Sequence, residues 1–483
     1  MDDLQPTNKK YMSLTAIIML DFVTIISFKD MLYPFQNQGL SVVISWIFLL
    51  IAYVIPYELI VSQLGLTFKN QEGGLASWVK RSSNSTLGYW TSWMYWVQSV
   101  PYMVDISNSI IVSWSWVFLG NNGLSKHMSP FIFGLLTFSI ILIFIIIQNI
   151  FNNSLETLSI IGGSAMFILS MLFVVLTGWA VLHGKHPATQ PFNWHAFVPK
   201  FSLHYFSTTG LLIFAMSGAE LAAPYISKLK KPREEFHKAM WTLAIMTGFM
   251  TIFESLSLGV FFNSRKIPSD FKMNGPYYAF QLLGQTLGCG KVLMYIFAVV
   301  QAVYMMAELA VLLDATSRVF AGDVADKFMP KWLTKKNKKG RPINAYILTA
   351  GLCLFLLLIT GTLPNINTIY NWLLNINGIV SPYKTCWVFF AFVMIRWNQK
   401  EFHSDYIFIK NRKGALAIGL WCLIFTFVCA TLGFIPQDAN LGTHLFNSQL
   451  IMNIITVILL FGMGLLLPWL RKREIRKEQQ NNK

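Results

Sequence analysis

Ser217, Gly218 and Glu220 lie in the middle of an apolar segment, residues 205–226, that contains no lysine or arginine. This composition is typical of a membrane-spanning helix, in which a carboxyl group is costly. Gly218 weakens a helix, and Pro224 limits how the helix continues. Interruptions at membrane depth occur where protein or a water-filled cavity receives the freed backbone groups, as in transporter substrate sites. A Gly/Ser packing face with a Glu bonded to a neighbouring helix explains the stretch about equally well.

The first apolar run, residues 13–35, is interrupted in a similar way. It contains the charged residues Asp21, Lys29 and Asp30, and Pro34 follows them. Charged side chains inside a span, followed by a proline, predict a second discontinuous helix.

Polar side chains also occur inside later spans. Tyr102, Asp105 and Asn108 recur at about three-residue spacing, so one face of their helix could line a cavity. Glu308 has no partner nearby in the sequence and either pairs across helices or faces the transport pathway. The polar face around Lys384 could also line a cavity, and hydrogen bonds between helices explain it about equally well.

The composition excludes a soluble protein. Of the 483 residues, 54% are hydrophobic, 15% are aromatic and only 12% are charged, which is typical of a polytopic membrane protein. The net charge of +16 does not indicate a nucleic-acid partner, because most lysines and arginines cluster between alternate apolar segments. That pattern predicts a plasma-membrane protein with both termini in the cytoplasm. We find no enzyme motif and no metal-ligand spacing, and we expect no cofactor.

About twelve membrane-spanning helices are expected, and the fold class is therefore all-α. They lie near residues 13–35, 41–64, 87–119, 129–149, 156–183, 205–227, 239–262, 288–316, 343–362, 370–395, 414–434 and 449–470. The stretch 70–81 is too short to cross and is expected to lie at the membrane interface.

The interrupted spans one and six each begin a block of five spans, which predicts an inverted repeat with a site at its midplane. The chain would then consist of a cytoplasmic N-terminus, two five-helix halves, two further helices and a basic cytoplasmic tail, at residues 1–12, 13–183, 184–395, 396–470 and 471–483.

Taken together, these residues resemble the amino acid, polyamine and organocation (APC) superfamily of transporters, and within it the bacterial glutamate/γ-aminobutyrate antiporter branch. The resemblance covers at least spans one to ten and depends on the order and spacing of several short motifs. These are Tyr33-Pro34 followed by Gly39, Ile55-Pro56, Glu72-Gly-Gly with Trp78-Val79, Ser217-Gly-x-Glu220 with Pro232, and Ala307-Glu308 followed by Ser317-Arg318 and Gly340-x-Pro342.

The resemblance implies a five-plus-five inverted repeat plus two helices, with an amino acid or amine held by the unwound middles of spans one and six. It favours an antiporter that exchanges an amino acid for another amino acid or its decarboxylation product by alternating access. The predicted substrate-binding residues are Ile25, Ile26, Ser27, Lys29, Tyr102, Ala215, Ser217, Gly218 and Ala219. The predicted gating or proton-linked residues are Glu220 and Glu308.

The chain also departs from this family pattern. Ser159 stands where many relatives have a lysine that mimics a sodium ion and braces span one against span eight. Lys29 could replace that lysine by pairing with a carboxyl such as Asp21, Glu220 or Glu308, or could contact an anionic group of the substrate. It could equally extend to the outer interface. Only about a dozen residues follow Leu470, so the C-terminal plug of some glutamate antiporters is not expected.

Two alternatives to an antiporter remain open. One is a proton-coupled amino acid importer. The other is a membrane sensor that keeps the fold without transport, which the bulky, charged first-span break would favour.

Overall fold

The computed structural model describes residues 11–481, apart from 72, 151–153, 321, 323–324, 338–341, 362 and 438–440. Within these residues the regular elements are helices, and the isolated bridge between Met12 and Leu229 is the one strand-like pairing. Helices satisfy their own backbone hydrogen bonds, which membrane depth requires. The predicted all-α class is confirmed.

Ten stretches of the described chain are long and apolar enough to cross a membrane. The first, Leu14–Thr67, has 54 residues, which is enough for two crossings. A further stretch, residues 85–119, is also long enough to cross but carries many polar side chains. The structure therefore accommodates the twelve predicted spans.

The first five spans contain several breaks and one π turn. Their elements are α1 (Leu14–Ile25), η1 (Phe28–Met31) and α2 (Leu32–Gln38); η2 (Gly39–Ser41), α3 (Val42–Leu49), η3 (Leu50–Val54) and α4 (Ile55–Thr67); α6 (Ser85–Val97) and α7 (Ser99–Leu119); α9 (Pro130–Ile150); and α10 (Ser154–Leu182).

The next seven spans follow the same pattern and end in a long C-terminal helix. Their elements are α12 (Leu203–Ser207), α13 (Thr209–Ala215) and η4 (Ala219–Lys228); α14 (Pro232–Phe249), η5 (Met250–Glu254) and α15 (Ser255–Phe261); α17 (Val292–Phe320); α20 (Ile343–Thr360); α21 (Ile366–Trp397); α22 (Arg412–Leu432); and α23 (His444–Gly462), continued by η6 (Met463–Leu465) and α24 (Leu466–Asn481).

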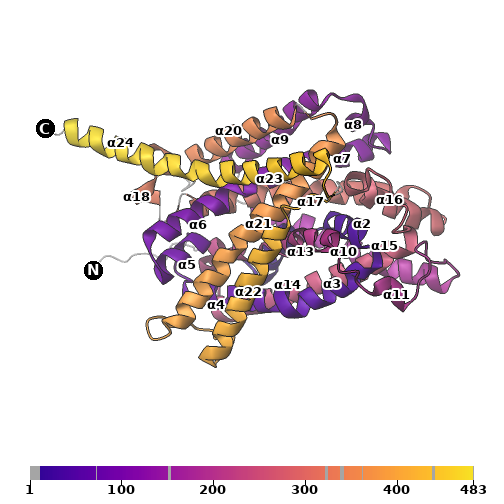
Figure 1. Cartoon of the computed structure of the whole chain (residues 1–483), viewed down its shortest axis with the longest axis horizontal. Coiled ribbons are helices and arrows are strands. Elements are labelled where there is room, and N and C mark those ends of the chain that lie inside the picture. Colours follow the sequence, from indigo (N-terminus) through magenta and orange to yellow (C-terminus); the bar gives the residue numbers. More distant parts are fainter. Residues whose placement is uncertain are drawn as a thin grey trace.

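Shorter elements lie between the spans: α5 (Gly74–Ser82), α8 (Gly123–His127), α11 (Trp194–Phe197), α16 (Phe271–Thr286), α18 (Ala325–Phe328) and α19 (Lys331–Thr334). Figure 1 shows α5 and α18 near one end of the long axis and α8, α11, α15 and α16 at the other. We refer to these as the α5 end and the α16 end.

The interrupted helices lie at the centre of the bundle. α1 packs against α10, α14, α17 and η4, and α13 packs against α21 and α22. By contrast, α9, α10, α22 and α23 expose large apolar side chains such as Ile143, Ile168, Ile424 and Ile458. Apolar side chains exposed around the outside of a bundle are expected where lipid is the solvent.

Two segments differ from the sequence prediction. α5 does form at the predicted place, but its apolar face packs on protein and not on lipid, because Leu75, Trp78 and Val79 are fully buried against α6, α21 and η4. α16 falls in a stretch that we expected to be a loop, and it buries Lys272 and Asn274 among its side chains. Its low overall hydropathy and internal Pro276 concealed it.

Two neighbouring spans contain a π turn. η3 interrupts the second span between α3 and α4, and η5 interrupts the seventh between α14 and α15. α3 lies against η5, and α14 lies against η3. The two π turns are therefore close to each other in neighbouring helices.

Candidate substrate site at two interrupted helices

The first break separates α1 from η1. Ile26 and Ser27 are extended, with φ/ψ of −147°/134° and −121°/163°. The backbone N–H and the Oγ of Ser27 donate to Asp30 Oδ2 at 2.8 and 2.9 Å. Tyr304 Oη donates to the carbonyl oxygen of Ile26 at 2.7 Å. Asp30 therefore caps the second half of the span, and Tyr304 satisfies a carbonyl that the helix no longer uses.

The second break separates α13 from η4. Gly218 has φ +148°, a conformation in which a side chain would be strained. A Cβ at this position would also lie 2.7 Å from the carbonyl oxygen of Thr24. Glycine is therefore required twice over, once for the turn and once because the backbones of the two breaks touch.

The predicted binding residues of the two breaks do come together. Ile25 and Gly218 are in contact, and α1 packs against η4. Ser27, Ser217 and Ala219 are buried beside them. The Ser217 hydroxyl does not point into free space, because its Oγ donates to the carbonyl oxygen of Ile213 at 2.7 Å.

Tyr102 and Glu308, predicted separately for substrate binding and gating, contact each other. Tyr102 Oη donates a hydrogen bond to Glu308 Oε1, and the Tyr102 ring lies 5.0 Å from that of Phe214. Glu308 Oε2 is buried and has no hydrogen-bond partner within the described chain. Glu308 is thus paired across helices through only one of its two oxygens.

Lys29 has a partner that the sequence did not indicate. Its Nζ lies 2.7 Å from Asp105 Oδ2 and 2.9 Å from Ser109 Oγ, both on α7. The Tyr370 ring lies 4.8 Å from the same nitrogen. The side chain is 7% exposed, so it does not extend to an interface. It ties the first span to the third, through a carboxylate that was not among the candidate partners Asp21, Glu220 and Glu308.

Glu220 belongs to a second buried ion pair. Its Oε1 accepts from Lys384 Nζ on α21, and its Oε2 accepts from Tyr57 Oη on α4. The Gly218 backbone N–H donates to the same Tyr57 oxygen at 3.0 Å. Tyr57 therefore links the second break directly to the carboxylate that follows it.

Sequence reasoning missed Tyr57, and it also missed Glu58 on the same helix. Glu58 and Asp21 are fully buried close to Glu220, and none of their carboxyl oxygens has a hydrogen-bond partner in the described residues. Glu58 could have been found, because an ionisable residue inside a span is a functional-site hypothesis by default. Among the described residues, no group of His, Cys, Asp and Glu is arranged to hold a metal ion.

A small cavity adjoins the two breaks on the side of the α16 end. Its volume of about 10 Å³ is enough for roughly one water molecule. It is lined by Lys29, Asp30, Tyr33, Pro34, Leu211, Phe214, Ala215, Lys272 and Leu374. The site is thus closed around the predicted binding residues Lys29 and Ala215.

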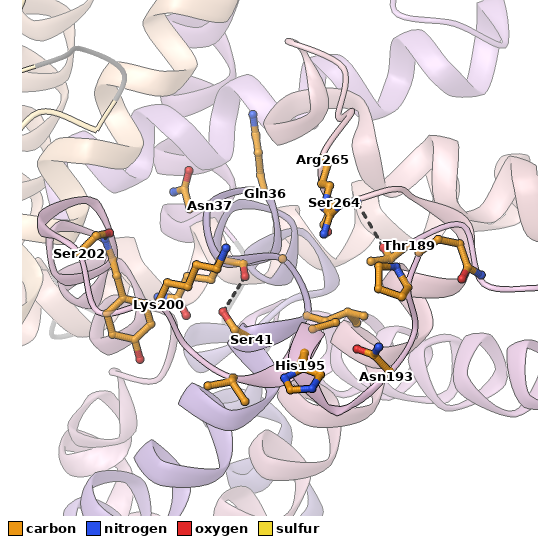
Figure 2. Close-up of a pocket in the computed structure, with 18 of the residues that line it drawn as sticks. Gln36, Asn37, Ser41, Thr189, Asn193, His195, Lys200, Ser202, Ser264 and Arg265 are labelled. Atoms are coloured by element: carbon orange, nitrogen blue, oxygen red, sulfur yellow. Dashed lines mark hydrogen bonds between the residues drawn. The ribbon is translucent and has the colours of Figure 1, made fainter.

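A larger pocket of about 450 Å³ opens at the α16 end. Figure 2 shows amide and hydroxyl side chains around it, with Lys200 and Arg265 on different sides. His195 on α11 and His204 on α12 also line it, and its described lining includes no Asp or Glu. A positively charged, amide-lined pocket suits an anion approaching from this end.

A model of the amino acid permease family matches residues 10–461, almost the whole chain. The chain belongs to this family. It is 38% identical over 448 residues to the aspartate/glutamate permease AcaP of Lactococcus lactis subsp. cremoris (strain MG1363), covering 92% of each chain. It is also 22% identical over 478 residues to a glutamate/gamma-aminobutyrate antiporter of Lactococcus lactis subsp. lactis (strain IL1403), covering 94% of this chain and 90% of the antiporter.

The fold of this permease is also found in a solved structure. The crystal structure of MhsT in complex with L-phenylalanine aligns with a TM-score of 0.62 at 12% identity, covering 89% of this chain and 100% of MhsT. The predicted five-plus-five inverted repeat with two additional helices is confirmed. The chain is therefore a multi-pass membrane protein that transports amino acids, and it is not an enzyme.

Proposed function

We propose that this permease is a secondary active transporter that carries an acidic amino acid by alternating access. The observation that supports it most is the backbone contact between Thr24 and Gly218, which places two unwound segments together in the middle of the bundle. The substrate class is suggested by the relative named as an aspartate/glutamate permease and by the two lysines in the small cavity.

In this proposal the substrate's α-amino and α-carboxylate groups bind at the two breaks. The half-helices that follow Ser27 and Gly218 have their N-terminal ends at the breaks, and such ends favour an anion. The half-helices that finish at Ile25 and Ala215 present carbonyl oxygens, which favour an ammonium group. Glu308 is assigned to a gating or proton-linked step, because it is a buried carboxyl next to the first break and only one of its oxygens is bonded. Glu220, which we had also predicted for such a step, is bonded on both oxygens and is assigned to holding the second break in place.

Exchange remains the transport mode that we propose first, and proton-coupled import is the second candidate. The relatives named as antiporters are 22–23% identical to this chain, whereas the relative named as a permease is 38% identical. Import is also favoured by the buried, unpartnered carboxyls of Asp21 and Glu58, because a proton could be carried there.

Uptake by proteoliposomes tests both parts of the proposal. Labelled aspartate or glutamate should enter liposomes that contain the purified protein. Under exchange, uptake should require internal amino acid or amine and should be insensitive to a pH gradient. Under proton-coupled import it should need no internal substrate and should increase when the outside is acidic. A protein that binds an amino acid but transports none in either arrangement would instead be a sensor.

Both termini are proposed to be cytoplasmic, from the distribution of Lys and Arg. This orientation places the α16 end outside, together with the exposed Cys289. A membrane-impermeant maleimide should therefore label Cys289 in whole cells. Labelling that occurs only after the membrane is opened would reverse the orientation.

A further inference from the structure

Lys29 is the cation closest to the first break, and it follows Ser27 by two residues. An ammonium group has three hydrogen-bond donors. In this structure one donates to Asp105 Oδ2 at 2.7 Å and another to Ser109 Oγ at 2.9 Å. The side chain is almost fully buried, with 7% exposed. Lys29 is therefore a fixed positive charge beside the predicted binding site.

The carboxylate that holds Lys29 is only half satisfied. Asp105 is fully buried, yet its Oδ1 has no hydrogen-bond partner in the described chain. A buried ion pair is strong only when its remaining lone pairs are also satisfied. The Lys29–Asp105 pair thus lacks the complete set of bonds that a purely structural pair would be expected to have.

Lys29 also lines the small cavity that adjoins the two breaks, together with Ala215 at the end of α13. Lys272 lines another side of this cavity, and its Nζ lies 4.0 Å from the centre of the Tyr33 ring. Two cations therefore border a space that also touches the residues predicted to hold the α-groups of an amino acid. Asp30 is the one acidic residue in the described lining, and its Oδ2 is engaged by Ser27.

We propose that Lys29 determines specificity by binding the side-chain carboxylate of an acidic substrate, and that Asp105 occupies that position while the site is closed. When the half-helix that carries Lys29 moves to open the cavity, the substrate's second carboxylate replaces Asp105 at Nζ. Asparagine and glutamine have the same shape but no charge, so they cannot replace a carboxylate there. This inference rests on the proposed function, because it assumes that acidic amino acids are the substrates.

The first test removes the pair without leaving a buried charge behind. The double variant Lys29→Met/Asp105→Asn should be compared with the wild-type protein in proteoliposomes, using aspartate and asparagine at equal concentrations. We expect the preference for aspartate to fall by about 100-fold or more, because a desolvated charge contact is lost. Lys69→Met is the matched control, since it removes a lysine from the ion pair with Asp405 at a partly exposed site and should keep the preference.

The second test predicts a gain in aspartate binding, where the first predicts a loss of preference, and it does not require transport. Asp105→Asn removes the internal competitor but keeps Lys29. Binding of aspartate to the purified protein, measured by isothermal calorimetry, should then tighten by about tenfold relative to asparagine, in proportion to the competition removed. A merely structural Asp105 would predict that both amino acids bind less well.

The outcomes separate the inference from the proposed function. Wild-type protein that prefers asparagine, or that carries no acidic amino acid, would overturn the proposed substrate class and this inference with it. Wild-type protein that prefers aspartate, with a double variant that keeps the preference, would overturn the role of Lys29 alone. If the double variant does not fold, the calorimetric result decides: tighter aspartate binding to Asp105→Asn supports the inference, and unchanged or weaker relative binding overturns it.

Discussion

Two buried lysine–carboxylate pairs flank the two breaks, and they differ in how completely they are bonded. Glu220, in the Lys384 pair, receives a donor on each oxygen, from Tyr57 and from Lys384. Asp105, in the Lys29 pair, has a donor on one oxygen only. The Lys29 pair borders the small cavity, whereas the Lys384 pair lines neither that cavity nor the pocket of Figure 2.

This difference in bonding suggests that the two pairs have different roles. A fully bonded pair that lines neither of these two cavities gains nothing from changing partners, so the Lys384 pair should hold the second break in place. An incompletely bonded pair beside a cavity can exchange one carboxylate for another at lower cost. Charge inside a membrane is expensive in both cases, but in our proposal the same chemistry serves structure in one pair and recognition in the other.

The largest effect should come from a change at the contact between Gly218 and Thr24. Gly218→Val places a side chain against the Thr24 carbonyl oxygen in a backbone conformation that valine does not tolerate. We expect uptake and substrate binding to fall to background while the protein still inserts into the membrane. Gly351→Ala is the control, because a Cβ there meets nothing within 4 Å. Normal binding by the Gly218 variant would show that the breaks do not form the site.

Next in size is the loss of the Lys384 pair. Lys384→Met leaves Glu220 buried without its cation, which typically costs about 3–5 kcal/mol of stability. The double variant Lys384→Met/Glu220→Gln should recover most of the lost thermal stability in detergent, because it leaves no unpaired charge. If the double variant melts no higher than the single one, the pair is not the structural tie that its bonding indicates.

A smaller effect is expected at Glu308, near the Lys29 pair. In Glu308→Gln the amide oxygen can still accept from Tyr102 Oη, so the free energy of unfolding should change by about 1 kcal/mol or less. The pH profile of transport or the choice among substrates should nevertheless shift, because the group can no longer bind or release a proton. A variant with an unchanged profile and preference would leave Glu308 with a structural role alone.

The smallest effect belongs to an ion pair outside the membrane spans. The hydrogen bond from Lys69, at 2.5 Å, lowers the pKa of Asp405 below its ordinary value. The ion pair therefore stabilises the folded state above the ordinary pKa of Asp405, and this stabilisation is lost as the pH falls through the lowered pKa of Asp405. The pair is 40% and 27% exposed, so Lys69→Met should cost less than about 1 kcal/mol. Thermal melts of the wild-type protein and of Lys69→Met at pH 7 and pH 3 measure this loss of stability. If Lys69→Met loses as much stability as Lys384→Met, burial does not explain why the two ion pairs differ in strength.

The positions of both breaks could be predicted from the sequence, because each leaves a local signal. The second break is marked by Gly218, Glu220 and Pro224 within one apolar run, and the first by charges at membrane depth. Helix count and fold class likewise follow from runs of about 20 apolar residues and from their order.

The partners of the charged residues could not be predicted. Asp105 is 76 positions from Lys29, and Lys384 is 164 positions from Glu220. Each choice depends on how helices pack, and hydropathy contains no information on which polar faces meet. The same limit explains α5, since an amphipathic helix at a lipid surface and one buried against protein have similar sequence patterns.

The two π turns in neighbouring spans have a mechanical consequence. A π turn disturbs the regular hydrogen-bond ladder of a helix and is a common place for it to bend. Because η3 lies against α14 and η5 lies against α3, the points at which the two spans can bend lie near each other. We expect the two spans to bend there while Gly218 and Thr24 stay in contact, so that the two breaks move together. Amide hydrogens at residues 50–54 and 250–254 should then exchange with deuterium faster than those one turn away on either side.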